Sequence, residues 1–207
     1  DNGDDGIDLN LAADGYAISA LLFSDVDGNV DDGIHAVQNS ANADTFALLA
    51  GTEAWDNGGV GFWYNLAAPN GDAAVCATDV EANFNGARGA HFAIAAGDEA
   101  ALLVGTNALP QFDMEFSGFF GADILDTFWD VIPQGSAEFM HNGSGGLQSD
   151  LVSTGGRVWV DVDGADAGFN VNNGFNLTLS GDTLFGRIND ADASDNGGNG
   201  INLEFNG

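Results

Sequence analysis

Short runs in which apolar and polar residues alternate recur along the whole chain. The clearest examples are residues 7–11, 158–162, 175–179 and 201–205. A period of two places the apolar side chains on one face of a strand and the polar side chains on the other. Each of these runs is therefore predicted to be a half-buried β-strand. Further strands are expected on similar grounds at residues 17–23, 45–50, 60–67, 75–84, 91–96, 101–104, 112–116 and 183–189.

Clusters of Gly, Asn and Asp separate these runs. Gly and Asn accept a positive φ and the Asp side chain bonds its own backbone, so the clusters are predicted to be turns. Many short strands separated by turns are typical of an all-β sandwich or barrel. We predict one domain over residues 1–207, a mainly antiparallel β-sandwich of the jelly-roll type. No tandem repeat of fixed period is evident in the sequence.

One segment has the spacing of a helix instead. Phe120, Ile124, Phe128 and Ile132 recur every four residues, and Pro133 follows them. This spacing predicts a short amphipathic helix around residues 120–132. It would pack on the sandwich or, alternatively, bind a partner.

The charge of the chain is extreme. It has 3 Lys+Arg against 32 Asp+Glu, a formal net charge of −29, while hydrophobic residues make up 44%. The apolar content is sufficient for a folded core, and the charge excludes nucleic-acid binding through phosphate contacts. No run approaches the roughly 18 apolar residues of a membrane span, so membrane insertion is not expected. Screening by high salt, as in a halophile, or by divalent cations is predicted.

The strongest candidate for a metal site is an acidic loop around Gly28. Asp25, Asp27, Asn29 and Asp31 offer oxygen atoms at alternate positions, which suits the six to eight oxygen ligands of Ca²⁺. The loop departs from the EF-hand pattern because no Glu closes it. An ordinary acidic turn is the alternative.

Two more acidic clusters are weaker candidates of the same kind. Because the chain is rich in Asp, such clusters also arise by chance. Their residues are Asp161, Asp163 and Asp166 in the first, and Asp190, Asp192 and Asp195 in the second.

A carbohydrate-active protein is the alternative function. Asp113 and Glu115 lie two apart on a predicted strand, as an acid and a nucleophile of a glycosidase could. Trp55, Trp63 or Trp159 could stack on sugar rings. The alternative is a calcium-stabilised jelly roll that binds or hydrolyses polysaccharide.

A location outside the cell is expected. The chain begins at Asp1 rather than Met, as a protein does after removal of a signal peptide. Asn142 and Asn176 lie in glycosylation sequons, which matter for a secreted protein. We therefore expect a protein secreted through a cleaved signal peptide to the cell surface or the medium.

The preferred function is structural, because no catalytic arrangement stands out. We expect a subunit that is not an enzyme and assembles with copies of itself into a filament, pilus-like fibre or surface layer. In this hypothesis the terminal strands 7–11 and 201–205 are shared between neighbours, and Ile7, Leu9 and Leu11 enter the next subunit. Calcium or high salt would brace the contacts.

Overall fold

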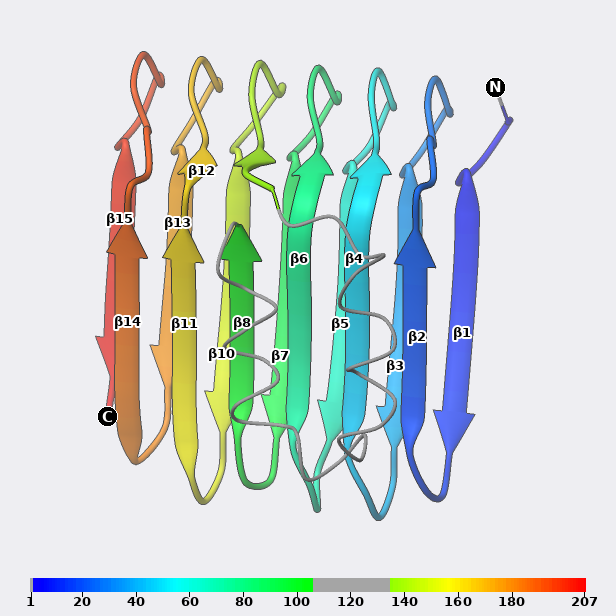
Figure 1. Cartoon of the computed structure of the whole chain (residues 1–207), viewed down its shortest axis with the longest axis vertical. Coiled ribbons are helices and arrows are strands. Elements are labelled where there is room, and N and C mark those ends of the chain that lie inside the picture. The colour runs from blue at the N-terminus through cyan, green and yellow to red at the C-terminus, as the bar shows by residue number, and fades with distance from the viewer. Residues whose placement is uncertain (1, 106–134) are drawn as a thin grey trace.

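The computed structural model describes residues 2–105 and 135–207, which form a parallel β-solenoid of stacked coils (Figure 1). All strand pairs within its two sheets are parallel. The prediction of an all-β protein is confirmed, but the antiparallel β-sandwich of the jelly-roll type is wrong. The predicted helix at 120–132 and the predicted strand at 112–116 lie outside the described residues.

One sheet, here called sheet A, contains seven strands. The chain enters this sheet once in every coil, so neighbouring strands of the sheet come from successive coils. In spatial order the strands are β1 (Ile7–Ala13), β3 (Ile34–Ser40), β5 (Phe62–Ala68), β7 (Ala90–Ala96), β10 (Leu147–Ser153), β13 (Phe175–Ser180) and β15 (Ile201–Asn206).

The opposite sheet, sheet B, runs the other way across the molecule (Figure 1). Two short strands, β9 (Ala137–Glu138) and β12 (Ala165–Asp166), extend it beside the end of β6. Its long strands are β2 (Ala17–Leu22), β4 (Thr45–Glu53), β6 (Ala73–Glu81), β8 (Ala100–Gly105), β11 (Arg157–Asp163) and β14 (Thr183–Asn189).

A repeat that the sequence analysis missed explains the parallel arrangement. Hydrogen-bonded residues of successive coils lie 26 to 28 positions apart, and 57 positions apart across residues 106–134. Alternation identifies a half-buried strand but not the direction of its neighbour, and the turn clusters between short strands favoured a mainly antiparallel sandwich. The repeat itself is hard to see because few positions keep their identity and one coil carries a long insertion.

Most predicted strands are present, but two long strands and the two short strands β9 and β12 were missed. Ile34–Ser40 and Leu147–Ser153 were not predicted because polar residues occupy several of their positions. In both strands a polar side chain points inward: Gln38 and Ser149 are fully buried. Gln38 is satisfied there because its Nε2 donates to the Phe46 carbonyl at 3.0 Å.

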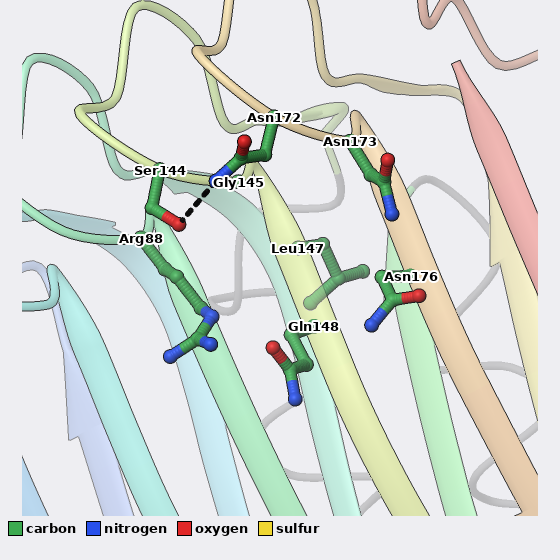
Figure 2. Close-up of a pocket in the computed structure, with 8 residues that line it drawn as sticks. All are labelled: Arg88, Ser144, Gly145, Leu147, Gln148, Asn172, Asn173 and Asn176. Carbon is green, nitrogen blue, oxygen red and sulfur yellow. Dashed lines mark hydrogen bonds between the residues drawn. The ribbon is translucent and has the colours of Figure 1, made fainter. Parts of the chain in front are cut away.

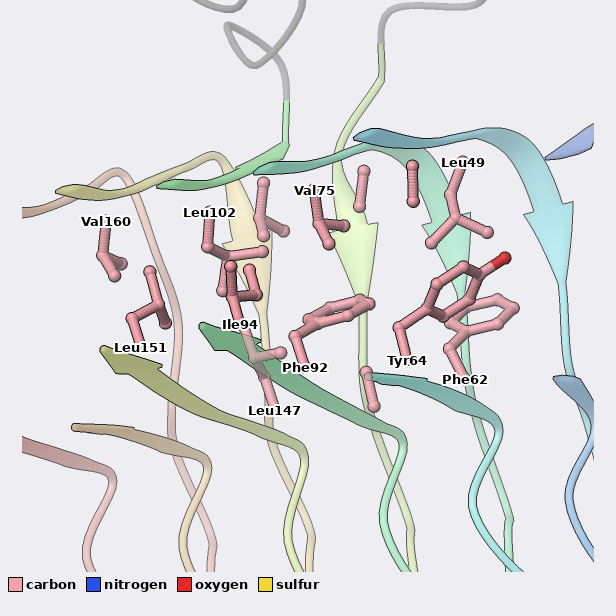
Figure 3. Packing of buried hydrophobic residues seen from close by; sticks show 14 of the residues in the cluster. Leu49, Phe62, Tyr64, Val75, Phe92, Ile94, Leu102, Leu147, Leu151 and Val160 are labelled. Carbon is pink, nitrogen blue, oxygen red and sulfur yellow. The ribbon is translucent and has the colours of Figure 1, made fainter. Parts of the chain in front are cut away.

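The main hydrophobic core fills the space between the two sheets (Figure 3). Because the strands are in register, equivalent inward residues stack on one another from coil to coil. Tyr64 lies beside Phe92, with ring centroids 6.1 Å apart, and Leu66 pairs with Ile94 in the same sheet. Burial of these columns of apolar side chains is the main favourable term for stacked coils, because a single coil cannot enclose a core.

Sheet B also has apolar side chains on its outer face. Phe46, Cys76, Leu103 and Trp159 belong to this second cluster and are nearly or fully buried. Burial raises the pKa of the Cys76 thiol far above its usual range. In the described part of the chain, no helix is long and apolar enough to cross a membrane.

The turns that lead from sheet B back to sheet A contain a strained position. It comes immediately before an inward-facing asparagine and adopts a positive φ in each coil from Gly28 to Asp195, including bulky residues: φ is 59° at Phe84, 58° at His141 and 57° at Phe169. Such a conformation is unfavourable for L-residues with large side chains. The three exposed rings stack face to face, with centroids 4.8 Å and 4.9 Å apart, and this stacking offsets part of the cost.

Candidate assembly and metal-binding sites

The asparagines after the strained position form a ladder along the inside of these turns. In the middle of the ladder, at Asn57, Asn85 and Asn142, the Oδ1 accepts hydrogen bonds from the backbone N–H and the side-chain amide of the preceding asparagine. The Nδ2 of each of these three donates to the next Oδ1 and to a backbone carbonyl of the preceding coil. The ladder residues are Asn2, Asn29, Asn57, Asn85, Asn142, Asn170 and Asn196.

The two ends of this ladder are chemically different. At the first coil, Asn2 donates to Asn29, and its Oδ1 accepts no hydrogen bond from the described residues. At the last coil, Asn196 accepts from Asn170, whereas its backbone N–H has no acceptor among the described residues. One end of the molecule therefore presents a free acceptor and the other a free donor, at equivalent positions.

The backbone hydrogen bonds of sheet A end in the same complementary way. The first residue of each strand donates its N–H to a glycine carbonyl of the next coil, as Ile7 does to Gly33 and Phe175 does to Gly200. Ile201 is next in this series, and no following coil is present among the described residues. At the opposite end, the Gly6 carbonyl occupies the position of the Gly33 carbonyl and accepts no backbone N–H from the described residues.

The predicted assembly residues lie in the first of these end strands. Strand β1 is paired with β3 over Ile7–Ala13, so only its other edge is open. Ile7 and Leu9 pack against the core of their own chain and are partly buried, and Leu11 is also partly buried. At the opposite end, Ile201 and Phe205 of β15 are 46% and 49% exposed.

A column of carboxylates runs along the end of sheet B. Each coil contributes one residue, and the neighbours are paired in register between strands, so that like charges face each other directly. In spatial order they are Asp25, Glu53, Glu81, Glu138, Asp166 and Asp192.

The column perturbs its own members. Partial desolvation is the main cause that raises the pKa of Glu53, although its side chain is exposed, and the charges of Asp25, Asp27 and Asp79 add to it. Burial and the charges of Glu138, Glu53 and Asp79 likewise raise the pKa of Glu81. Facing like charges destabilise neighbouring strands, so protons, salt or divalent cations should stabilise this edge.

The four ligands predicted around Gly28 do not converge. Asn29 is buried in the asparagine ladder, where its Nδ2 donates to Asn57 at 2.8 Å. Asp27 accepts a hydrogen bond from the backbone N–H of Trp55 at 2.9 Å, and Asp25 belongs to the carboxylate column. The carboxylate of Asp31 lies near those of Asp4 and Asp5 in the first coil. Calcium binding by this loop remains a prediction.

The second predicted cluster is organised around an arginine. Arg187 donates from Nε and Nη2 to the two carboxylate oxygens of Asp161, both at 2.7 Å, and lies 3.5 Å from Asp163. Asp161 is only 3% exposed, so this pair compensates a buried charge. Asp166 lies in the column instead.

The third predicted cluster lies in the last turn. Asp192 is in the column and caps the backbone N–H of Ser194 at 2.9 Å, whereas Asp195 occupies the strained position, with a φ of 55°. Asp190 also has a positive φ, of 47°, and is exposed. Among the described residues, no hydrogen bond, ion pair or metal-sized cluster joins the three carboxylates.

Acidic groups converge at a place that the sequence analysis did not identify. Asp5, Asp8 and His35 each offer an atom within 4.8 Å of the others, and Asp4, Asp5 and Asp31 form an adjoining group. Within the first group His35 Nδ1 lies 3.2 Å from Asp8 and 3.6 Å from Asp5, so an ion pair also accounts for it. Only the spacing of one coil, 27 residues, could have indicated these contacts.

The remaining candidates are the predicted carboxylate pair, the two glycosylation sequons and the tryptophans. Asp113 and Glu115 lie outside the described residues. Asn142 is 1% exposed and both bonds of its Nδ2 are internal, so this sequon is closed to glycosylation, whereas Asn176 lies on the outer face of sheet A. The side chains of Trp55 and Trp159 each have a buried Nε1 without a hydrogen-bond partner.

No protein-family model matches the chain, and searches of curated proteins and of solved structures also found no match.

Proposed function

We propose that the protein is a structural rod whose copies join end to end through sheet A and the asparagine ladder. The observation that supports this is the complementarity of the two ends. Ile201 and Asn196 offer free N–H donors at one end, and Gly6 and Asn2 offer the matching oxygen acceptors at the other.

The joint would repeat the contacts that already hold the coils together. With β15 of one copy beside β1 of the next, Ile201 would donate to Gly6 and Asn196 to Asn2, as their counterparts do inside the chain. Such a contact uses different surfaces on the two partners and does not close on itself, so it generates a filament. In the hypothesis drawn from the sequence, Ile7, Leu9 and Leu11 enter the next subunit. In this proposal β1 stays in its own sheet and pairs with the edge strand of the neighbouring copy.

The joint leaves one gap. Within the described residues sheet A has strands from seven coils, whereas the long strands of sheet B come from six. The first and last described strands, β1 and β15, both lie in sheet A, so a joint between them would make sheet A continuous and leave sheet B one strand short between β14 and β2 of the next copy. We therefore expect the joint to be weaker than the contact between two internal coils.

Charge sets the conditions for assembly. Each copy carries a net charge of −29, which opposes association at low ionic strength. Salt shortens the range of this repulsion, and divalent cations would bind the carboxylate column. Surroundings rich in salt or calcium suit such a rod, and an extracellular or cell-surface location is part of the proposal.

Electron microscopy and light scattering test the proposal on the purified chain, in low salt with EDTA, in high salt, and with excess Ca²⁺. We expect filaments in the last two conditions. Ile201→Pro removes the free N–H and blocks the edge, at the first residue of a strand where proline is tolerated. It should abolish filaments while the circular dichroism stays native.

Ile201→Val is the matched control, because it keeps both the N–H and a β-branched side chain. It should assemble like the original chain. A monodisperse monomer in all three conditions would sink the proposal, and so would filaments that form equally well from the Ile201→Pro variant.

A further inference from the structure

A polar pocket of about 310 Å³ opens on the outer face of sheet A (Figure 2). Three successive coils form it. Arg88 comes from the turn before β7, Ser144 and Gln148 from the turn before β10 and from that strand, and Asn173 and Asn176 from the turn before β13 and from that strand.

Arg88 is exceptional among the three arginines of the chain. Arg157 pairs with Glu99 at 2.8 Å and Arg187 pairs with Asp161 at 2.7 Å. Arg88 forms no ion pair with any described residue, although acidic residues outnumber Lys+Arg by 32 to 3. Its guanidinium extends towards the pocket, near Gln148 (Figure 2).

The Nδ2 of Asn172 donates to Ser144 and the Nε2 of Gln148 donates to Asp150, but the other two amides of the pocket keep free donors. Asn173 Oδ1 accepts from the backbone N–H of Asn199 at 2.8 Å, and Asn176 Oδ1 accepts from Asn202 at 2.7 Å. The Nδ2 groups of Asn173 and Asn176 have no acceptor among the described residues. Arg88 and these two amides therefore leave the pocket with an excess of hydrogen-bond donors.

The surroundings of the pocket favour an anion at this place. The nearest carboxylate along β10, Asp150, is not a lining residue and already accepts from Gln148 at 3.0 Å and from His91 at 3.2 Å. A guanidinium forms its strongest hydrogen bonds with a carboxylate, which it can hold with two parallel N–H donors.

We propose that this pocket binds a sugar that carries a carboxylate, with the carboxylate on Arg88 and the hydroxyl groups on Asn173, Asn176 and Ser144. A sugar matches the pocket because its hydroxyls need several oriented polar partners, and uncharged amides and a hydroxyl surround the single cation. Trp63 lies in the same cross-strand row as His91 and Gln148, so a longer saccharide could extend along this row. This inference does not depend on end-to-end assembly.

Calorimetric titration with oligogalacturonate tests the proposal at fixed ionic strength, and the neutral oligosaccharide of glucose serves as the comparison ligand. We expect saturable binding of the acidic oligosaccharide only. Arg88→Gln should weaken that binding about tenfold or more, because a hydrogen-bonded charge is lost. Arg88→Lys should give an intermediate loss, since it keeps the charge without the two parallel donors.

Arg157→Gln is the matched control: it makes the same change in net charge at a residue of sheet B, and binding should be unchanged. The titrations are repeated in the Ile201→Pro background, so that a failure to assemble cannot be mistaken for a failure to bind. Equal affinity of the Arg88→Gln variant, equal binding of the neutral sugar, or displacement by acetate or sulfate at equal concentration would each overturn the proposal.

Discussion

At the scale of single residues, the inward asparagine of each turn is the most constrained side chain. Asn85 shows why: its Oδ1 accepts from the backbone and side chain of Asn57, and its Nδ2 donates to Asn142 and to the Ala54 carbonyl. It is 1% exposed, so no water can replace these bonds. Asp, the closest polar substitute, lacks the donor and would bring a charge into the buried turn.

Asn85→Ala should lower the free energy of unfolding by about 3 kcal/mol or more, because several buried partners lose their bonds at about 1–3 kcal/mol each. Urea denaturation measures the loss. Asn65→Ala is the control, since Asn65 faces outward on β5 and its side chain makes no hydrogen bond to the described residues. It should change stability by less than about 0.5 kcal/mol. Equal effects of the two substitutions would contradict the structural role of the ladder.

The lone cysteine gives a second prediction at this scale. Cys76 is fully buried, and burial raises the pKa of its thiol, so it should not react with a thiol reagent in the native protein. It should become reactive in urea with the same midpoint as the loss of circular dichroism. Rapid labelling without denaturant would show that the outer face of sheet B opens in solution.

At the scale of elements, the carboxylate column is the least favourable part of the sheets. Parallel pairing in register places equivalent positions of successive coils side by side. Apolar side chains at such positions stabilise the sheet by packing together, whereas like charges destabilise it by repulsion. The column lies at the end of sheet B, where solvent and ions reach it. Its members Glu53 and Glu81 have raised pKa values, mainly because the sheet partly desolvates their carboxylates, although the Glu53 side chain is exposed.

The column makes stability depend on pH. A raised pKa means that the folded state holds its protons more tightly than the unfolded state does, whose glutamates titrate near 4.5. The stabilising contribution is therefore complete below 4.5 and is lost as the pH rises through the raised values. Thermal unfolding in EDTA from pH 4 to pH 7, at fixed ionic strength, should show the melting temperature falling over this range.

Glu53→Gln should make that dependence shallower, because one titrating group leaves the column. Glu204→Gln, on the outer face of β15 and outside the column, should leave the slope as it is. A slope unchanged by Glu53→Gln would show that the pH dependence arises elsewhere.

At the scale of the whole molecule, the described residues contribute an unequal number of long strands to the two sheets, and in the proposed assembly this difference sets how copies would join. Gly207 follows β15 as Gly181 follows β13, and Gly181 donates its N–H to the Asn206 carbonyl. A chain extended from Gly207 could therefore enter sheet B beside β14. In β14 the inward residues Leu184 and Ile188 pack against the core and are only partly covered.

Appending a second copy of residues 182–189 after Gly207 should fill the vacant strand position. We expect the extended chain to form filaments at lower salt and to unfold at higher urea than the original. The control carries the same extension with polar residues in place of the two inward apolar positions, and it should show neither gain. If both extensions behave alike, the gap in sheet B does not limit assembly.

Much of the molecule follows from the sequence itself. Alternating residues and Gly, Asn and Asp clusters were enough to predict an all-β chain and most strands, as at Thr183–Asn189, because both signals are local. Composition was enough to predict a core and an anionic surface. The metal ligands remain predictions, although the structure shows that Asn29 is held inside the ladder and Asp161 pairs with Arg187.

Only the tertiary structure determined the direction in which strands pair. Hairpins and solenoid coils can share the same alternation and the same turn residues, and the difference lies in contacts between residues 26 to 28 positions apart. Those contacts created the asparagine ladder, the carboxylate column and the pocket around Arg88, none of which is contiguous in the chain. The sequence by itself specified which residues form most of the strands. Packing between coils decided which residues meet, because a core is enclosed only when coils stack on one another.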